Sequence, residues 1–370
     1  MSVPLAGRGI AAVLGALLVI TATHSVIGTV VVPRAVGSWL TRWVDRLVNG
    51  LYRMAAARIA DHARRDRVLA SQAATILLAQ LVAWLVIFYV GFALLMWPFV
   101  PGVTAAFTLA GPAVFGPNDG TGAPERIIAD LAAIAALITV TLQIAYLPTL
   151  YSAFNRRETE VALLNARAGV PSWGPELLAR THYALGSGMS TINTLPDLYE
   201  QWERWAADVS ESHTTYLPLV RFRSPKPLSS WVTALLAVLD SAALFLAVSP
   251  KSAPVVSARL CLRSGFLCFR DVATAMGVDV PAEPDPGAGI SLSYDEFLEA
   301  IARMRKVDFP IERDPADAWT DFVGWRVNYE QAAYAVAYRL DVVPALWSGP
   351  RPLPRIPIAP LRPPGGKPPK

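Results

Sequence analysis

Long runs of apolar residues, separated by polar stretches, dominate the first 150 residues of the chain. Three of these runs, 9–32, 72–100 and 127–150, reach the roughly 20 residues that a spanning helix requires. The first run is longer than the roughly 7–15 residue apolar core of a signal peptide, and no small-residue cleavage site follows it. The pattern therefore predicts three transmembrane helices, the first of them uncleaved.

The pattern changes after residue 155, where charged residues and turn signals become frequent and the apolar spacing is helical. Strand-like alternation is nearly absent, and Ser293 with Glu296 forms a capping-box pattern ahead of an apolar run. We therefore predict an all-α protein, with integral membrane helices followed by a mostly helical cytoplasmic domain at 151–348. The proline-rich, cationic segment 349–370 is predicted to be a disordered tail.

One further apolar segment, 230–248, is almost long enough to cross a membrane. Asp240 lies at its centre, and an acid in the middle of a membrane costs several kcal/mol unless it is partnered. Positive charges also flank the segment on both sides. We therefore expect a buried helix of the cytoplasmic domain, and a fourth span is the alternative.

Composition and charge support a membrane protein and orient it. Hydrophobic residues make up 53% of the chain and charged residues only 17%, against roughly a quarter in soluble proteins. Eight arginines separate the first two spans: Arg34, Arg42, Arg46, Arg53, Arg58, Arg64, Arg65 and Arg67. Since positive loops stay in the cytoplasm, we predict a multi-pass protein of the cell membrane, with its N-terminus outside and its C-terminus cytoplasmic.

The basic segment 34–71 between the first two spans has a helical pattern of its own. Apolar positions recur at helical spacing among the arginines, at Leu40, Val44, Leu47, Leu51 and Met54. This pattern predicts a basic amphipathic helix that lies on the anionic inner leaflet, or else an ordinary cytosolic helix. The pI near 9.1 comes from these arginines and the tail, which favours the lipid bilayer over nucleic acid as a partner.

The loop between the second and third spans has the layout of a channel pore loop, so that 72–150 reads as a two-helix pore-like module. A short helix at 102–111 would precede a filter segment at 112–119. In potassium channels, backbone carbonyls of a Thr-x-Gly-aromatic-Gly strand replace the water around the ion. Phe115 and Gly116 match the aromatic-Gly pair, and Asp119 follows as an acid.

The chain resembles bacterial potassium-channel-like membrane proteins, which pair a two-helix pore domain with a long cytoplasmic helical region. The resemblance also rests on "LQIAYLPTLYSAFNRRETEVALLNARAG" at 142–169 and "WERWAADVSESHTTY" at 202–216. It implies ion transport, with a monovalent cation as the partner, and a homo-oligomer, a tetramer if the protein is a channel. Pro148, where the third span ends, could act as the hinge of a gate.

The filter itself departs from the family pattern. Ala113 and Val114 stand where glycine would let the carbonyls point at the ion, and an alignment from Thr108 to Gly111 also lacks the middle glycine. Four interpretations stay open: a degenerate or non-selective pore, a gating subunit of a mixed assembly, a surface loop without an ion path, and a non-conducting membrane sensor or scaffold. In the last, the cytoplasmic helices bind a protein partner.

The cytoplasmic half shows no catalytic constellation. Glu211 and His213 are two residues apart and do not share a helical face. Cys261 and Cys268, seven apart, predict buried thiols on one helix face, and with four scattered histidines they make no zinc signature. We therefore predict that the protein is not an enzyme and has neither a cofactor nor a metal site.

Overall fold

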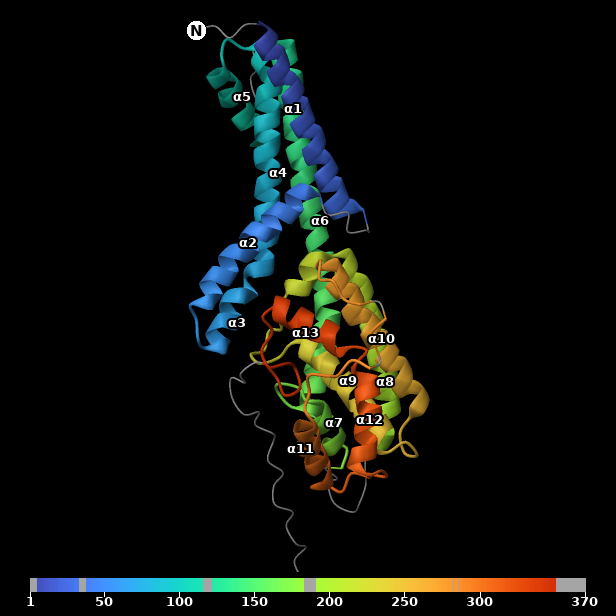
Figure 1. Ribbon diagram of the computed structural model, residues 1–370. Helices are drawn as coiled ribbons and strands as arrows, with labels where there is room; N and C mark the ends of the chain where they lie inside the picture. The colour runs from blue at the N-terminus through green and yellow to red at the C-terminus, as the bar shows by residue number, and fades with distance from the viewer. Residues whose placement is uncertain are drawn as a thin grey trace, which may run out of the picture. The chain divides into compact units, whose positions relative to one another are not determined.

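The computed structural model describes residues 5–32, 38–115, 122–182, 191–281, 283–285 and 287–350. Every regular element in these ranges is a helix, as predicted, and Figure 1 shows their arrangement within each unit. The α-helices are α1 (Leu5–Val26), α2 (Trp39–Ala57), α3 (His62–Ala70), α4 (Gln72–Met96), α5 (Val103–Phe115), α6 (Ala123–Ala168), α7 (Gly174–Arg180), α8 (Leu195–Thr215), α9 (Trp231–Val248), α10 (Val255–Ala275), α11 (Tyr294–Arg305), α12 (Pro315–Arg326) and α13 (Glu330–Arg339). Shorter helical turns follow α1, α4 and α8 and precede α8.

The chain divides into two compact units. Unit 1 comprises Met1–Arg58 and Ser71–Ser152, and unit 2 comprises Ile59–Ala70 and Ala153–Lys370. The basic segment 34–71, which the sequence suggested as one piece, is therefore split between the units. Its second part, α3, belongs to unit 2, where Asp66 pairs with Arg223 and Arg65 pairs with Asp341.

Unit 1 is built around α4, against which α1, α2 and α5 all pack. α1 and α4 approach each other closely: a Cβ added to Gly15 would lie 2.6 Å from the carbonyl oxygen of Gly91. Small residues at helix crossings let backbones approach in this way, and they are typical of helices packed in membranes. The core of unit 1 also includes Trp84, Phe88 and Phe92 of α4.

Among the residues that the structure describes, four helical stretches are long and apolar enough to cross a membrane: Ala6–Val31, His62–Phe99, Ala123–Ala168 and Trp231–Val248. The three predicted spans overlap the first three of these. They leave much of their apolar surface uncovered, since only 28%, 44% and 28% of their most apolar windows are buried. On α6, Leu137 and Ile144 belong to this uncovered apolar surface and are 68% and 62% exposed.

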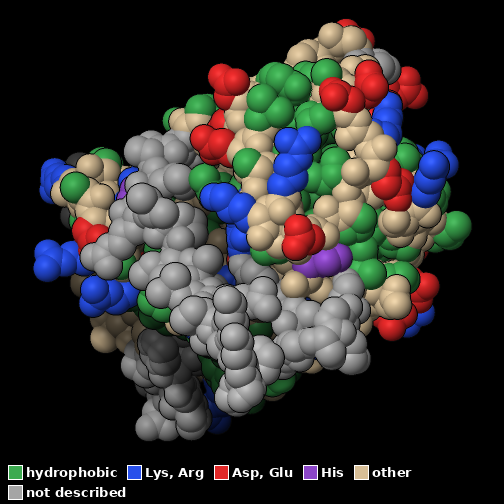
Figure 2. Space-filling model, turned by 90° about the horizontal axis from the view of Figure 1, so that it is seen from below, with side chains coloured by type: hydrophobic (Ala, Val, Ile, Leu, Met, Phe, Trp, Pro, Cys, Tyr) green, Lys and Arg blue, Asp and Glu red, His purple; other side chains and the backbone are tan. Residues whose placement is uncertain are grey.

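Unit 2 is built around α9, whose 18 residues are all buried. α7, α8, α10, α12 and α13 pack against it, and Figure 1 shows it inside this group of helices. α9 is thus the buried helix that the sequence favoured over a fourth span. The face drawn in Figure 2 carries acidic and basic side chains interspersed with hydrophobic ones, as surfaces in water do.

Two smaller sequence expectations are also confirmed in unit 2. Ser293 and Glu296 form the reciprocal capping box at the start of α11, where the Ser293 hydroxyl accepts from the Glu296 backbone N–H at 3.2 Å. Cys261 and Cys268 are free, buried thiols on α10. Burial raises the pKa of both thiols, so they stay protonated and unreactive.

Candidate functional site

The candidate pore loop begins with α5, which is held against α4 by one aromatic residue. The Tyr89 hydroxyl donates to the Phe107 carbonyl at 3.2 Å, and the two rings meet edge to face with centroids 5.5 Å apart. Ala106 and Ala110 are fully buried on the same helix, and a Cβ added to Gly111 would lie 3.7 Å from the Tyr89 ring. The small side chains let α5 pack closely on α4, and the hydrogen bond fixes its register.

The structure places the predicted pore-loop residues differently from an extended filter. α5 runs from Val103 through Phe115 and ends four residues beyond the predicted end of the pore helix, so the backbone of Ala113 and Val114 is helical. The sequence offers no glycine there to leave the helical region of backbone conformations. Gly116 and Asp119, together with the side chains of Ala113, Val114 and Phe115, lie outside the described residues.

The other predicted site residues lie within helices. The Thr108 hydroxyl donates to the carbonyl of Thr104, one turn earlier, at 2.7 Å. Pro148 lies inside α6, which continues without a break to Ala168. A proline in a helix interior removes one hydrogen bond, so Pro148 marks a weakened turn rather than a helix end. Its role as a hinge stays a prediction.

A chain of side-chain hydrogen bonds near the C-terminal end of α1 was not predicted from the sequence. Trp84 donates its indole N–H to the Ser25 hydroxyl at 2.9 Å, in a fully buried position. The Ser25 hydroxyl also lies 2.7 Å from that of Ser38, which caps α2. This chain ties α1, α2 and α4 together through side chains that are 59 and 13 residues apart in sequence. The apolar periodicity gave no signal for it.

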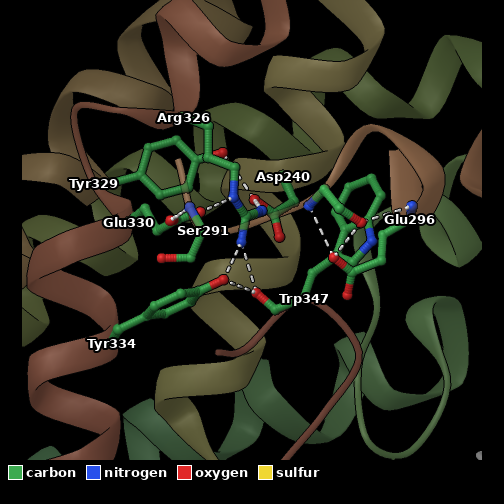
Figure 3. A network of polar contacts seen from close by, with 9 residues as sticks. Asp240, Ser291, Glu296, Arg326, Tyr329, Glu330, Tyr334 and Trp347 are labelled. Atoms are coloured by element: carbon green, nitrogen blue, oxygen red, sulfur yellow. Dashed lines mark hydrogen bonds and ion pairs between the residues drawn. The ribbon is translucent and has the colours of Figure 1, made fainter. Parts of the chain in front are cut away.

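The densest polar cluster of unit 2 surrounds Arg326, whose side chain is fully buried (Figure 3). Its guanidinium pairs with the carboxylates of Asp240 on α9 and, at 2.6 Å, of Glu330 on α13. It also donates to the Tyr334 hydroxyl at 2.8 Å and to the Trp347 carbonyl at 2.6 Å. Each of the three guanidinium nitrogens therefore donates to an acceptor. Asp240 gains the cationic partner that a carboxylate inside an apolar helix requires.

Aromatic rings complete the surroundings of this cation. The Arg326 guanidinium lies 5.9 Å from the Phe322 ring centroid, 5.8 Å from that of Tyr334 and 5.6 Å from that of Trp347. Burial opposes the charge, but Asp240 and the neighbouring groups outweigh it and raise the pKa of Arg326 well above its ordinary value. Arg326 is therefore a permanent cation that joins α9, α12, α13 and the end of the described chain. All of the cluster except Tyr334 is buried, and its contacts are those of a structural centre.

The described residues give no support for metal or nucleophile chemistry. They contain no group of three or more His, Cys, Asp or Glu side chains placed to hold a metal ion. An open depression between α8 and α10 is lined by Glu200, Glu203 and Arg204 on one side and by Val256 and Leu260 on the other.

Comparison with protein-family models, with curated proteins and with solved structures found no match. The chain is thus placed by its structure alone, as an all-helical protein with several helices that could span a membrane.

Proposed function

We propose that the protein is an integral membrane protein in which the α4–α5–α6 module forms an ion pathway between several copies of the chain. The supporting observation is α5, a short apolar helix between two helices of spanning length. Tyr89 holds it against α4. A helix in this position shields a loop from lipid, and irregular backbone at membrane depth is tolerated only with such shielding. A pathway of this type needs several chains, because one two-helix module cannot enclose an ion.

A second candidate is a non-conducting membrane protein whose unit 2 binds a protein partner in the cytoplasm. The helical backbone at Ala113 and Val114 favours it, because a potassium filter needs an extended, carbonyl-lined segment. The well-packed core of unit 2 supports it as well, since a binding scaffold requires a folded domain.

Ion flux into liposomes that contain the purified protein separates the two candidates. We expect potassium or sodium flux above that of protein-free liposomes. Replacing Tyr89 by alanine removes the hydrogen bond and the ring contact that hold α5, and we expect the flux to fall. Tyr338→Ala is the matched control, because Tyr338 is 80% exposed in unit 2. Absence of flux from a folded oligomer, or a strictly monomeric protein, would favour the scaffold.

A further inference from the structure

The helix α2 has two apolar faces, and only one of them is covered. Leu40, Val44 and Val48 are buried in the core of unit 1. The other face is a stripe of five large apolar residues, each between 50% and 60% exposed: Trp39, Trp43, Leu47, Leu51 and Met54. Their spacing of four, four, four and three residues places them along one side of the helix. The sequence pattern merged these two faces into one.

The covered face fixes α2 at the ends of two candidate spans. The Ser38 hydroxyl at its start lies 2.7 Å from the hydroxyl of Ser25, near the end of α1. Farther along, Gln72, the first residue of α4, donates to Asn49 at 2.7 Å. Tyr52 makes a 2.7 Å hydroxyl contact with Thr75, also in the first turn of α4. If α1 and α4 cross a bilayer, α2 is therefore held where they leave the hydrocarbon.

Arginines border the exposed stripe along one edge. At roughly 100° per residue, Arg42, Arg46 and Arg53 all fall within about 60° of Trp39 around the helix axis. All three are exposed. Asp45 is the only acid in α2, and it accepts from Asn49 at 3.0 Å on the covered side. The edge of the stripe is thus positively charged, with no acid among its residues.

We propose that the exposed stripe of α2 is a binding surface for anionic phospholipid, in which the apolar side chains enter the headgroup boundary and the arginines contact lipid phosphates. Tryptophan at this depth and arginine along the edge are the features of a helix that lies in a membrane interface. Long arginine side chains reach phosphates while their stems remain on apolar surface. The inference rests on the proposed membrane location of unit 1.

Single fluorescent labels on the full-length protein in lipid nanodiscs test the proposal. Leu47→Cys places a dye on the stripe, Leu137→Cys places one on the exposed face of α6, and Val256→Cys places one on unit 2, where Val256 is 73% exposed. The native thiols of Cys261 and Cys268 are fully buried and should not react. Lipids that carry a quencher in the acyl chain then report contact. We expect quenching at positions 47 and 137 and none at position 256.

The same label tests the preference for negative charge. With the quencher on anionic lipid, quenching at position 47 should exceed that with the quencher on neutral lipid at the same fraction. Replacing Arg42, Arg46 and Arg53 by glutamine should abolish this excess, since each basic residue near an anionic surface contributes roughly fivefold to binding. High salt should weaken it too.

The possible failures have different meanings. Quenching at 137 but not at 47 would overturn this inference and leave the membrane location intact. Quenching at neither position would overturn the membrane location itself. If the dye at 47 is equally shielded in detergent without lipid, the stripe is covered by protein, and a crosslink between two labelled chains would assign that cover to a second copy. Equal quenching by neutral and anionic lipid would overturn the charge preference.

Discussion

α9 and α6 contain windows of similar hydropathy, yet the two helices meet different surroundings. All 18 residues of α9 are buried by its own unit, whereas only 28% of the corresponding window of α6 is buried. Hydropathy therefore does not tell whether lipid or protein covers a helix. The difference in burial comes from the neighbouring helices. Unit 2 surrounds α9 with helices on several sides, and it supplies a cation for the acid at the centre of α9.

Removing that cation should produce the largest effect. In Arg326→Met, the carboxylates of Asp240 and Glu330 lose their buried partner, and breaking one partner of a buried ion pair costs about 3–5 kcal/mol. We expect unit 2 to unfold at much lower urea concentration, as followed by tryptophan fluorescence of the full-length protein in detergent. Arg326→Met combined with Asp240→Asn should recover part of the loss, because one uncompensated carboxylate is then gone.

Arg305→Met is the matched control, since Arg305 is an exposed residue of α11 in the same unit. Surface changes of this kind stay within about 0.5 kcal/mol. If Arg326→Met and Arg305→Met unfold at the same urea concentration, the cation is not what permits an acid inside α9. Helix packing alone would then explain why α9 is buried and α6 is not.

The sequence predicted the class of the fold and one member of this cluster, but not the cluster itself. Asp240 stood out because a lone acid in an apolar run needs a partner. That partner is 86 residues away, and helical periodicity reports only neighbours along one helix. Arg326 looked like any other arginine near a helix end. Long-range pairing depends on how helices pack, and a single sequence does not encode that in a local pattern.

The candidate pore loop shows the same limit at shorter range. The position of a short helix after residue 102 was predictable from its apolar residues and the flanking turns, and α5 begins at Val103. The C-terminal end of this helix was not predictable, because neither Pro112 nor the alanine and valine after it stops the helix before Phe115. The contact with Tyr89 was also missed, since Tyr89 reads as one more apolar residue of the span.

In unit 1, where apolar surface stays exposed, close helix contacts should matter next. A Cβ on Gly15 would lie 2.6 Å from a backbone oxygen and 2.8 Å from the backbone nitrogen of Leu95, so Gly15→Ala forces α1 away from α4. We expect a loss of about 1–3 kcal/mol, as for overpacked interiors. Helicity during titration with sodium dodecyl sulfate measures it.

Gly9 provides the control, because it lies in the same helix and a Cβ there would meet nothing within 4 Å. Gly9→Ala should be neutral or stabilise α1 slightly, since alanine favours helix more than glycine does. Equal effects of the two changes would show that the α1–α4 crossing does not hold unit 1 together.

The smallest effect concerns a buried histidine in unit 2 and should appear as a pH dependence. An N–H of Arg157 lies 2.9 Å from Nε2 of His213 and donates to it, which requires a neutral ring. Burial, and then the charge of Arg157, hold the pKa of His213 well below its ordinary value. An unfolded histidine has a pKa near 6.5. Below that pH the unfolded chain binds a proton that the folded chain excludes, so stability falls as the pH drops.

The expected contribution is at most about 1.4 kcal/mol per pH unit, since one proton is involved. Other groups add slopes of their own, and therefore the informative quantity is the difference between variants. His213→Gln should lower the stability at neutral pH and flatten the loss between pH 6.5 and 5. If His213→Gln lowers the free energy of unfolding equally at every pH, the slope is unchanged. That outcome would contradict the prediction, because it would mean that the ring of His213 accepts a proton in the folded protein.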